Sequence, residues 1–136
     1  MKFIIPSVKQ VVETNKYICT QQGNPFAVMN EGKIESAIHS AFYPGSYPFL
    51  NGGIASIAGA LCFYLVMAHA FIDGNKRTGT LVALTFMNLN GWDLLYPESE
   101  ENERSALANI IEKCAASQLT KEELMEWFEA HKIPMT

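Results

Sequence analysis

The apolar residues at the start of the chain recur at the spacing of an amphipathic helix. This first stripe is formed by Val8, Val11, Val12, Ile18 and Cys19. Ser7 and Gln10 have the spacing of a capping box at its start, and Gly23 offers a left-handed end. The pattern therefore predicts a first helix between Ser7 and Gly23.

Two further helices are predicted before the middle of the chain. After a turn, residues 26–29 have a briefly extended pattern, and Asn30 can cap a second helix. Residues 44–53 are rich in Pro, Gly, Ser and Tyr, which indicates a loop long enough to be functional, although an ordinary surface loop fits equally well. A third helix, apolar on nearly all sides, is predicted over residues 54–70 at the centre of the fold.

The second half of the chain continues the helical pattern. A fourth helix is predicted from about Asn75 to residues 90–91, and residues 92–96 form a short crossing segment. We expect Ser99 to cap a fifth helix with two glutamates in its first turn, and Thr120 to open a last helix with a capping box. No long alternating pattern and no internal repeat occur, so the predicted class is all-α.

Composition restricts the classes of protein that the chain can represent. With 49% hydrophobic and 18% charged residues, residues 1–136 are expected to form one globular domain. A net charge of −4 argues against direct binding of nucleic acid, which needs a basic surface. Cys19, Cys62 and Cys114 are widely spaced at apolar positions, which favours buried reduced thiols. With no signal peptide evident, a cytoplasmic location is expected.

The uncharged segment of residues 52–72 has about the length that crosses a bilayer. It contains Ser56, ends near His69 and runs directly into a charged segment without an aromatic belt. These features favour a helix surrounded by other helices over a membrane span.

Polar and charged residues interrupt the apolar pattern where the third and fourth helices should meet. Gly74 and Asn75 lie at the expected start of the fourth helix, where amide groups without intrahelical partners form an anion site. Lys76 and Arg77 in this first turn are unfavourable with respect to the helix dipole, and a polyanion bound there would explain their placement. Arg77 can hold a phosphate with two N–H groups and Lys76 can act as a point charge, so the pattern predicts a phosphate site.

The same segment contains groups suited to phosphate chemistry. Asp73 can hold Mg²⁺ together with phosphate oxygens, and His69 can take a proton from an attacking hydroxyl. Phe71 would anchor the loop by burying its ring. Taken singly, each residue also fits a capped helix–loop–helix without function; the ordered set favours a site. His39 and His131 have no companions that would form another one.

The residues His69-Ala70-Phe71-Ile72-Asp73-Gly74-Asn75-Lys76-Arg77-Thr78 resemble the signature of the Fic/Doc superfamily, and specifically its Doc branch. The Fic branch has Gly in place of Lys76 and a second Arg in place of Thr80, which normally helps to hold the nucleotide phosphates. The resemblance is strong over residues 62–91 and loose elsewhere. It implies a bundle of about six helices around the helix pair that carries the motif.

The resemblance also implies an activity and a role for each residue of the motif. Doc toxins transfer phosphate from ATP to a threonine of translation elongation factor Tu, with ATP bound in the reverse sense from Fic enzymes. On that basis His69 is the base, Asp73 holds Mg²⁺, and Gly74, Asn75, Lys76 and Arg77 hold the nucleotide phosphates. Transfer of AMP to a protein and a non-catalytic module that binds an antitoxin remain as alternatives.

An inhibitory helix of the Fic type carries Ser or Thr four residues before Glu, and the Glu is followed by Gly or Asn. Glu31 and Glu101 have a suitable following residue, but Ala27 and Pro97 stand where the Ser or Thr is needed. No internal inhibitor is evident. We therefore expect a separate antitoxin protein to supply an inhibitory helix.

Overall fold

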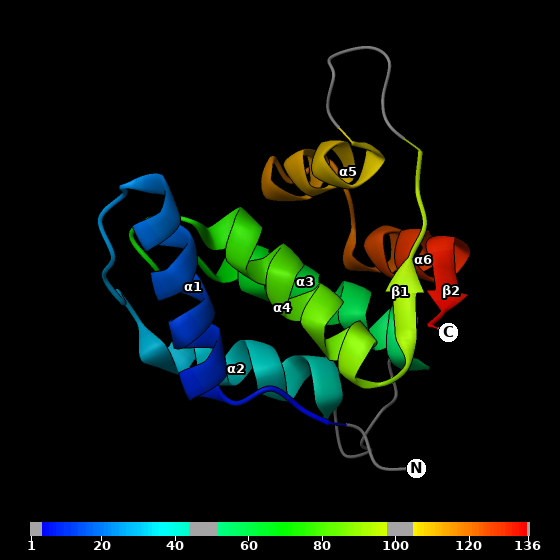
Figure 1. Cartoon of the computed structure of the whole chain (residues 1–136), viewed down its shortest axis with the longest axis horizontal. Coiled ribbons are helices and arrows are strands. Elements are labelled where there is room, and N and C mark those ends of the chain that lie inside the picture. The colour runs from blue at the N-terminus through cyan, green and yellow to red at the C-terminus, as the bar shows by residue number, and fades with distance from the viewer. Residues whose placement is uncertain (1–3, 44–51, 98–104, 136) are drawn as a thin grey trace.

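The computed structural model describes residues 4–43, 52–97 and 105–135. Its helices are α1 (Val8–Gln22), α2 (Glu31–Phe42), α3 (Ile54–Ala68), α4 (Asn75–Leu89), α5 (Ala106–Ala115) and α6 (Lys121–His131) (Figure 1). Two short strands, β1 (Trp92–Leu94) and β2 (Lys132–Pro134), pair antiparallel. The predicted all-α class is confirmed. That residues 1–136 form a single domain stays a prediction.

Helix α3 lies at the centre of the molecule and packs most extensively against α4, α6 and α2 (Figure 1). Ile57, Leu61 and Cys62 on α3 are completely buried. Neighbouring helices on several sides thus account for the uncharged segment. Within the described residues, no helix is long and apolar enough to cross a bilayer.

Two glycines allow the helices to approach α3 closely. A Cβ atom added at Gly79 of α4 would lie 2.9 Å from Val66 Cγ2 and 3.2 Å from the Cys62 carbonyl oxygen. On α3 itself, a Cβ atom added at Gly59 would lie 2.7 Å from the Cα atom of Met125 in α6. Any larger residue at these positions would push the helices apart, so both contacts depend on glycine.

The predicted helix caps are present at three helices. Ser7 and Gln10 form a capping box at α1, and Gly23 ends that helix with φ of 69°. The Asn30 side chain accepts from the Lys33 amide at the start of α2. Thr120 forms the expected capping box at α6, with Glu123 as its partner.

The predicted start of the fifth helix was wrong. Helix α5 begins at Ala106, and its N-cap is Ser105, whose hydroxyl accepts from the Ala108 amide at 3.1 Å. Ser99 lies outside the described residues. Both serines are adequate caps by residue type, and the apolar stripe that follows Ser105 packs against α3 and α4.

Two other predictions concern the connecting segments. Helix α3 ends at Ala68 instead of residue 70, because His69 adopts a left-handed conformation. The crossing segment after α4 contains β1, which pairs with a strand at the end of the described chain. Three-residue strands are too short to give an alternating pattern in the sequence. Of the predicted loop at residues 44–53, residues 44–51 lie outside the described part.

Candidate active site

Two left-handed residues bracket the loop that joins α3 to α4. His69 has φ of 50° and Gly74 has φ of 76°. Glycine adopts this conformation without strain, whereas a residue with a Cβ atom does so at a cost of about 1 kcal/mol or more. The His69 side chain is exposed, and within the described residues its ring makes no hydrogen bond. The backbone therefore presents the imidazole to solvent at the end of a rigid helix.

Asn75 closes the loop from within. Its side-chain oxygen accepts from the Phe71 amide at 3.2 Å, and its side-chain nitrogen donates to the Phe71 carbonyl at 2.9 Å. The Phe71 ring is buried, as its predicted anchoring role requires. Because the Asn75 side chain is used in this way, its contribution to an anion site would come from its backbone amide.

The start of α4 is open toward the loop. Gly74 is the N-cap residue and provides no side chain to satisfy the first amide groups, and the first turn contains no acidic residue. The side chains of Lys76 and Arg77 in that turn are exposed. Unsatisfied amides, the positive end of the helix dipole and two cations together favour binding of an anion.

Asp73 and His69 face the same hollow beside this helix end. The hollow has a volume of about 280 Å³, and its lining includes His69, Asp73, Gly74, Asn75, Lys76 and Arg77. The structure thus brings together every site residue predicted from the sequence. Asp73 Oδ1 accepts from the Gly74 amide at 2.8 Å, which fixes the orientation of the carboxylate.

Two residues near this hollow were not predicted from the sequence. Glu112 of α5 accepts a hydrogen bond from Lys76 Nζ at 2.6 Å, in an ion pair with both side chains about half exposed. Gln22, at the end of α1, also lines the hollow. With its amide oriented to face its partner, the Gln22 oxygen accepts from Arg77 Nε at 3.1 Å. The motif cations are therefore held by α5 and α1.

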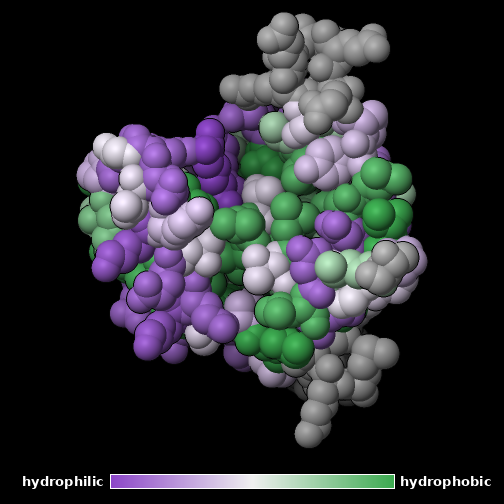
Figure 2. Space-filling view, in the orientation of Figure 1, coloured by the Kyte–Doolittle hydropathy of each residue, from purple (hydrophilic) through white to green (hydrophobic). Residues whose placement is uncertain are grey.

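A larger hollow of about 640 Å³ lies between α4 and α5 and shares Lys76 and Arg77 with the smaller one. Leu81, Leu84 and Ile111 give it an apolar lining. Figure 2 shows this apolar depression between the hydrophilic surface near the start of α4 and the surface of α5. Its size is in the range of small-molecule sites.

The extended segment before α2 pairs with the motif loop. Val28 and Phe71 form an antiparallel bridge, and the Ile72 amide donates to the Ala27 carbonyl at 3.0 Å. The Met29 amide donates to the Ala70 carbonyl at 2.7 Å. The predicted extension of residues 26–29 is thereby confirmed at Val28, and the segment packs along one side of the α3–α4 loop.

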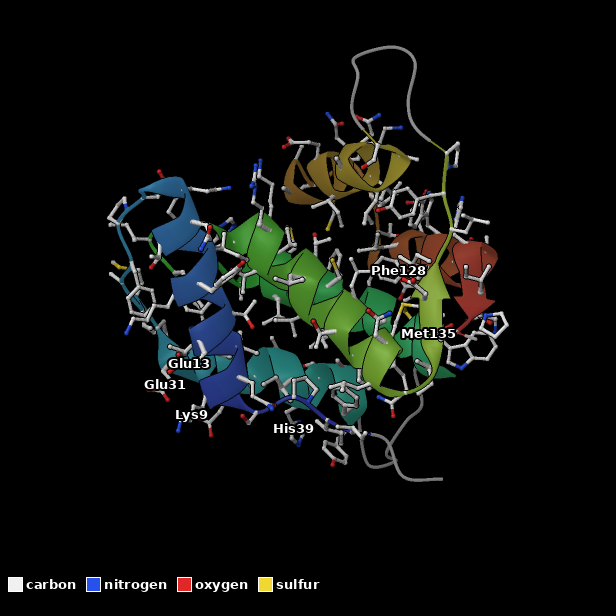
Figure 3. All side chains as sticks on the ribbon, in the orientation of Figure 1. Lys9, Glu13, Glu31, His39, Phe128 and Met135 are labelled. Atoms are coloured by element: carbon white, nitrogen blue, oxygen red, sulfur yellow. The ribbon has the colours of Figure 1, made fainter. Side chains whose placement is uncertain are left out.

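The remaining histidines are not part of this site. His39 is exposed and projects from the outer edge of α2 (Figure 3). His131 stacks on Trp127 with ring centroids 4.0 Å apart, and its Nδ1 is 2.7 Å from the Trp127 carbonyl oxygen. No group of three or more potential metal ligands occurs within the described residues. The α3–α4 junction is therefore the candidate active site.

Comparison with known proteins agrees with this geometry. The model of the Fic/DOC family matches residues 6–87, which is more than half of the chain and includes the whole α3–α4 junction. No curated protein matches the chain. Fic/DOC proteins are generally transferases that use a nucleotide to modify another protein. The matched residues include the uncapped helix start, the two cations, the carboxylate and the imidazole. The chain therefore belongs to the Fic/DOC family.

Proposed function

We propose that this protein is a Doc-type toxin that transfers the γ-phosphate of ATP to a hydroxyl side chain of a target protein, with translation elongation factor Tu as the expected target. The observation that carries the proposal is the shared hollow in which His69 and Asp73 lie beside the uncapped, cationic start of α4. A phosphate group bound there would lie next to both an acid–base group and a magnesium ligand.

The nucleotide phosphates would bind at the start of α4. The backbone amides of Asn75, Lys76 and Arg77 lie in its first turn, where amides have no intrahelical acceptor. Arg77 can make two N–H bonds to a phosphate, and Lys76 can add charge after it leaves Glu112. The donor set is therefore suited to a polyanion.

Asp73 suits a magnesium ion that is shared with the nucleotide. Mg²⁺ is commonly held by one or two carboxylates together with phosphate oxygens and water. A lone, oriented carboxylate next to a phosphate site matches that preference, since the described residues hold no cage of several acidic ligands. Bound Mg²⁺ would neutralise charge on the phosphates during transfer.

His69 would act as the general base. Its exposed imidazole can accept the proton of an incoming Ser or Thr hydroxyl without breaking an existing hydrogen bond to the described residues. The hydroxyl oxygen then forms a bond to the γ-phosphorus, and the bond between that phosphorus and the bridging oxygen breaks. The products are a phosphorylated protein and ADP, and the proton remains on His69.

Phosphate transfer is favoured over AMP transfer by Lys76 and Thr80. In the Fic branch, an Arg at the position of Thr80 normally helps to hold the nucleotide phosphates. Here the Thr80 hydroxyl donates to the Lys76 carbonyl at 2.8 Å and carries no charge. The cations of the site are therefore concentrated in the first turn of α4, and the apolar hollow toward α5 would accept the nucleoside.

The two reactions are separated by the position of a radioactive label. The protein is incubated with elongation factor Tu, Mg²⁺ and ATP labelled on either the α- or the γ-phosphorus. We expect label on the factor only from γ-labelled ATP, with a mass increase of one phosphate group. Label only from the α position would replace the kinase proposal with AMP transfer, and no label from either would remove this target.

A second experiment separates an enzyme from a non-catalytic module that binds only an antitoxin. Expression of the unsubstituted chain should arrest bacterial growth, whereas His69→Ala and Asp73→Ala chains at equal abundance should not. Full retention of growth arrest by both variants would favour the binding module. Lys9→Ala, on the exposed surface of α1, serves as the control and should arrest growth normally.

A further inference from the structure

Asn15 is the fully buried polar side chain of α1. It lies outside the motif and contacts the loop that joins α3 to α4. Its exposed fraction is 0%. It occupies a position on the apolar stripe of α1, between Val11 and Ile18, where an apolar residue would complete the helix face. Burial of an amide there is unfavourable unless all of its polar atoms are bonded.

Both polar atoms of the Asn15 side chain are hydrogen bonded, and one of the bonds leads directly to the active-site loop. Its nitrogen donates to the Asp73 carbonyl oxygen at 2.8 Å and to Thr78 Oγ1 at 3.0 Å. Its oxygen accepts from Cys19 Sγ at 3.6 Å. The same side chain thus ties α1 to the residue that precedes Gly74 and to the first turns of α4.

The contact with the loop leaves no free space. A Cβ atom added at Gly74 would lie 3.0 Å from the Asn15 side-chain nitrogen and 3.4 Å from Cys19 Sγ. Gly74 in turn donates its amide to the carboxylate of Asp73. A continuous series of contacts therefore runs from Asn15 through the peptide group of Asp73 and the Gly74 amide to the Asp73 carboxylate.

We propose that Asn15 is a positioning residue that sets the orientation of the Asp73 carboxylate for the divalent cation. This inference rests on the proposed function, because it assigns to Asp73 the role of metal ligand. Asn15 itself would touch neither the nucleotide nor the cation. Its effect would pass through the backbone of the loop to the carboxylate.

The test compares a change that removes the loop contact with one that preserves it. Asn15→Asp keeps the size of the side chain but replaces the donating nitrogen with an oxygen, so both donated bonds are lost. Thr78→Val removes only the bond to α4 and leaves the bond from Asn15 to the Asp73 carbonyl. Both variants should lower the melting temperature, which controls for general loss of stability.

The readout is the affinity for Mn²⁺, measured by electron paramagnetic resonance with the full chain and a non-hydrolysable ATP analogue. We expect Asn15→Asp to weaken Mn²⁺ binding by about 10- to 100-fold, the usual effect of removing a partner that orients a metal ligand. Thr78→Val should bind Mn²⁺ like the unsubstituted chain. Affinity for the analogue without metal should be the same in all three.

Each outcome bears on the inference in a defined way. Equal Mn²⁺ affinities in Asn15→Asp and Thr78→Val would overturn it and leave the proposed function intact, provided that the unsubstituted chain binds the cation. Absence of Mn²⁺ binding by the unsubstituted chain would overturn the proposed function and this inference together. If Asn15→Asp does not fold, Asn15→Ser takes its place, with the same expected weakening and the same contrary result.

Discussion

At the scale of single residues, the site is defined by polar groups that lack the partners such groups usually have at the start of a helix. The first amides of α4 have no capping side chain, and Lys76 and Arg77 lie where a helix dipole disfavours cations. The sequence predicted this combination because all the residues are consecutive. Asn15, Gln22 and Glu112 were missed because they lie on α1 and α5, far from the motif in the sequence. Only Asn15 could have been noticed, because it is a polar residue within the apolar stripe of α1.

The ion pair of Lys76 and Glu112 should compete with a bound nucleotide. Glu112→Gln removes the competing carboxylate, so ATP affinity should rise. The rise should not exceed about five-fold, because exposed ion pairs contribute about 0.2–1 kcal/mol. Titration calorimetry at low and high salt measures it, and the gain should shrink at high salt. Glu122→Gln, which alters the pair with Lys121 on α6, is the control. Lower ATP affinity in Glu112→Gln would assign Glu112 to binding instead.

The thiol groups should be unreactive in the folded protein. Cys19, Cys62 and Cys114 are all buried and unpaired with one another in disulfides. Burial raises the pKa of Cys62 and raises that of Cys114 to about 11, so the reactive thiolate is scarce at pH 8. Mass spectrometry after treatment with iodoacetamide should find all three alkylated only when the chain is unfolded. Rapid labelling of any of them in the native protein would contradict the packing described for that residue.

At the scale of elements, the sequence predicted helices best where the starting signal was local. The capping boxes at Ser7 and Thr120 placed the starts of α1 and α6 correctly. The start of α5 was misplaced because Ser99 and Ser105 are equally good caps, and the choice depends on packing against α3 and α4. The β1–β2 pair depends on an encounter between distant segments, which no local pattern reveals.

Close packing between elements gives a prediction at Gly59. Gly59→Ala should lower the free energy of unfolding by about 1–3 kcal/mol, because the added Cβ atom meets the backbone of Met125 in α6 and α3 cannot move away without strain. Urea unfolding measures the change. Gly32→Ala is the matched control, since a Cβ atom there would meet only the end of the Asn30 side chain. Equal stability of Gly59→Ala and the unsubstituted chain would contradict the close contact of α3 with α6.

At the scale of the whole molecule, two helices from outside the motif support the active site around a central helix pair. Helices α3 and α4 supply the motif, α1 holds Asp73 and Arg77 from one side, and α5 holds Lys76 from the other. The family match ends at residue 87, before α5 begins. The contacts from α5 therefore belong to the part of the chain that the family model does not cover.

The most direct test is to locate bound ATP on the chain by nuclear magnetic resonance. At 15.1 kDa, the protein suits assignment of its backbone amides. On titration with ATP and Mg²⁺, the amides of Gly74, Asn75, Lys76 and Arg77 should show the largest shifts, because they form the uncapped start of α4 beside the hollow. Saturable shifts confined to another surface, or no shifts at millimolar ATP, would contradict a nucleotide site at the α3–α4 junction.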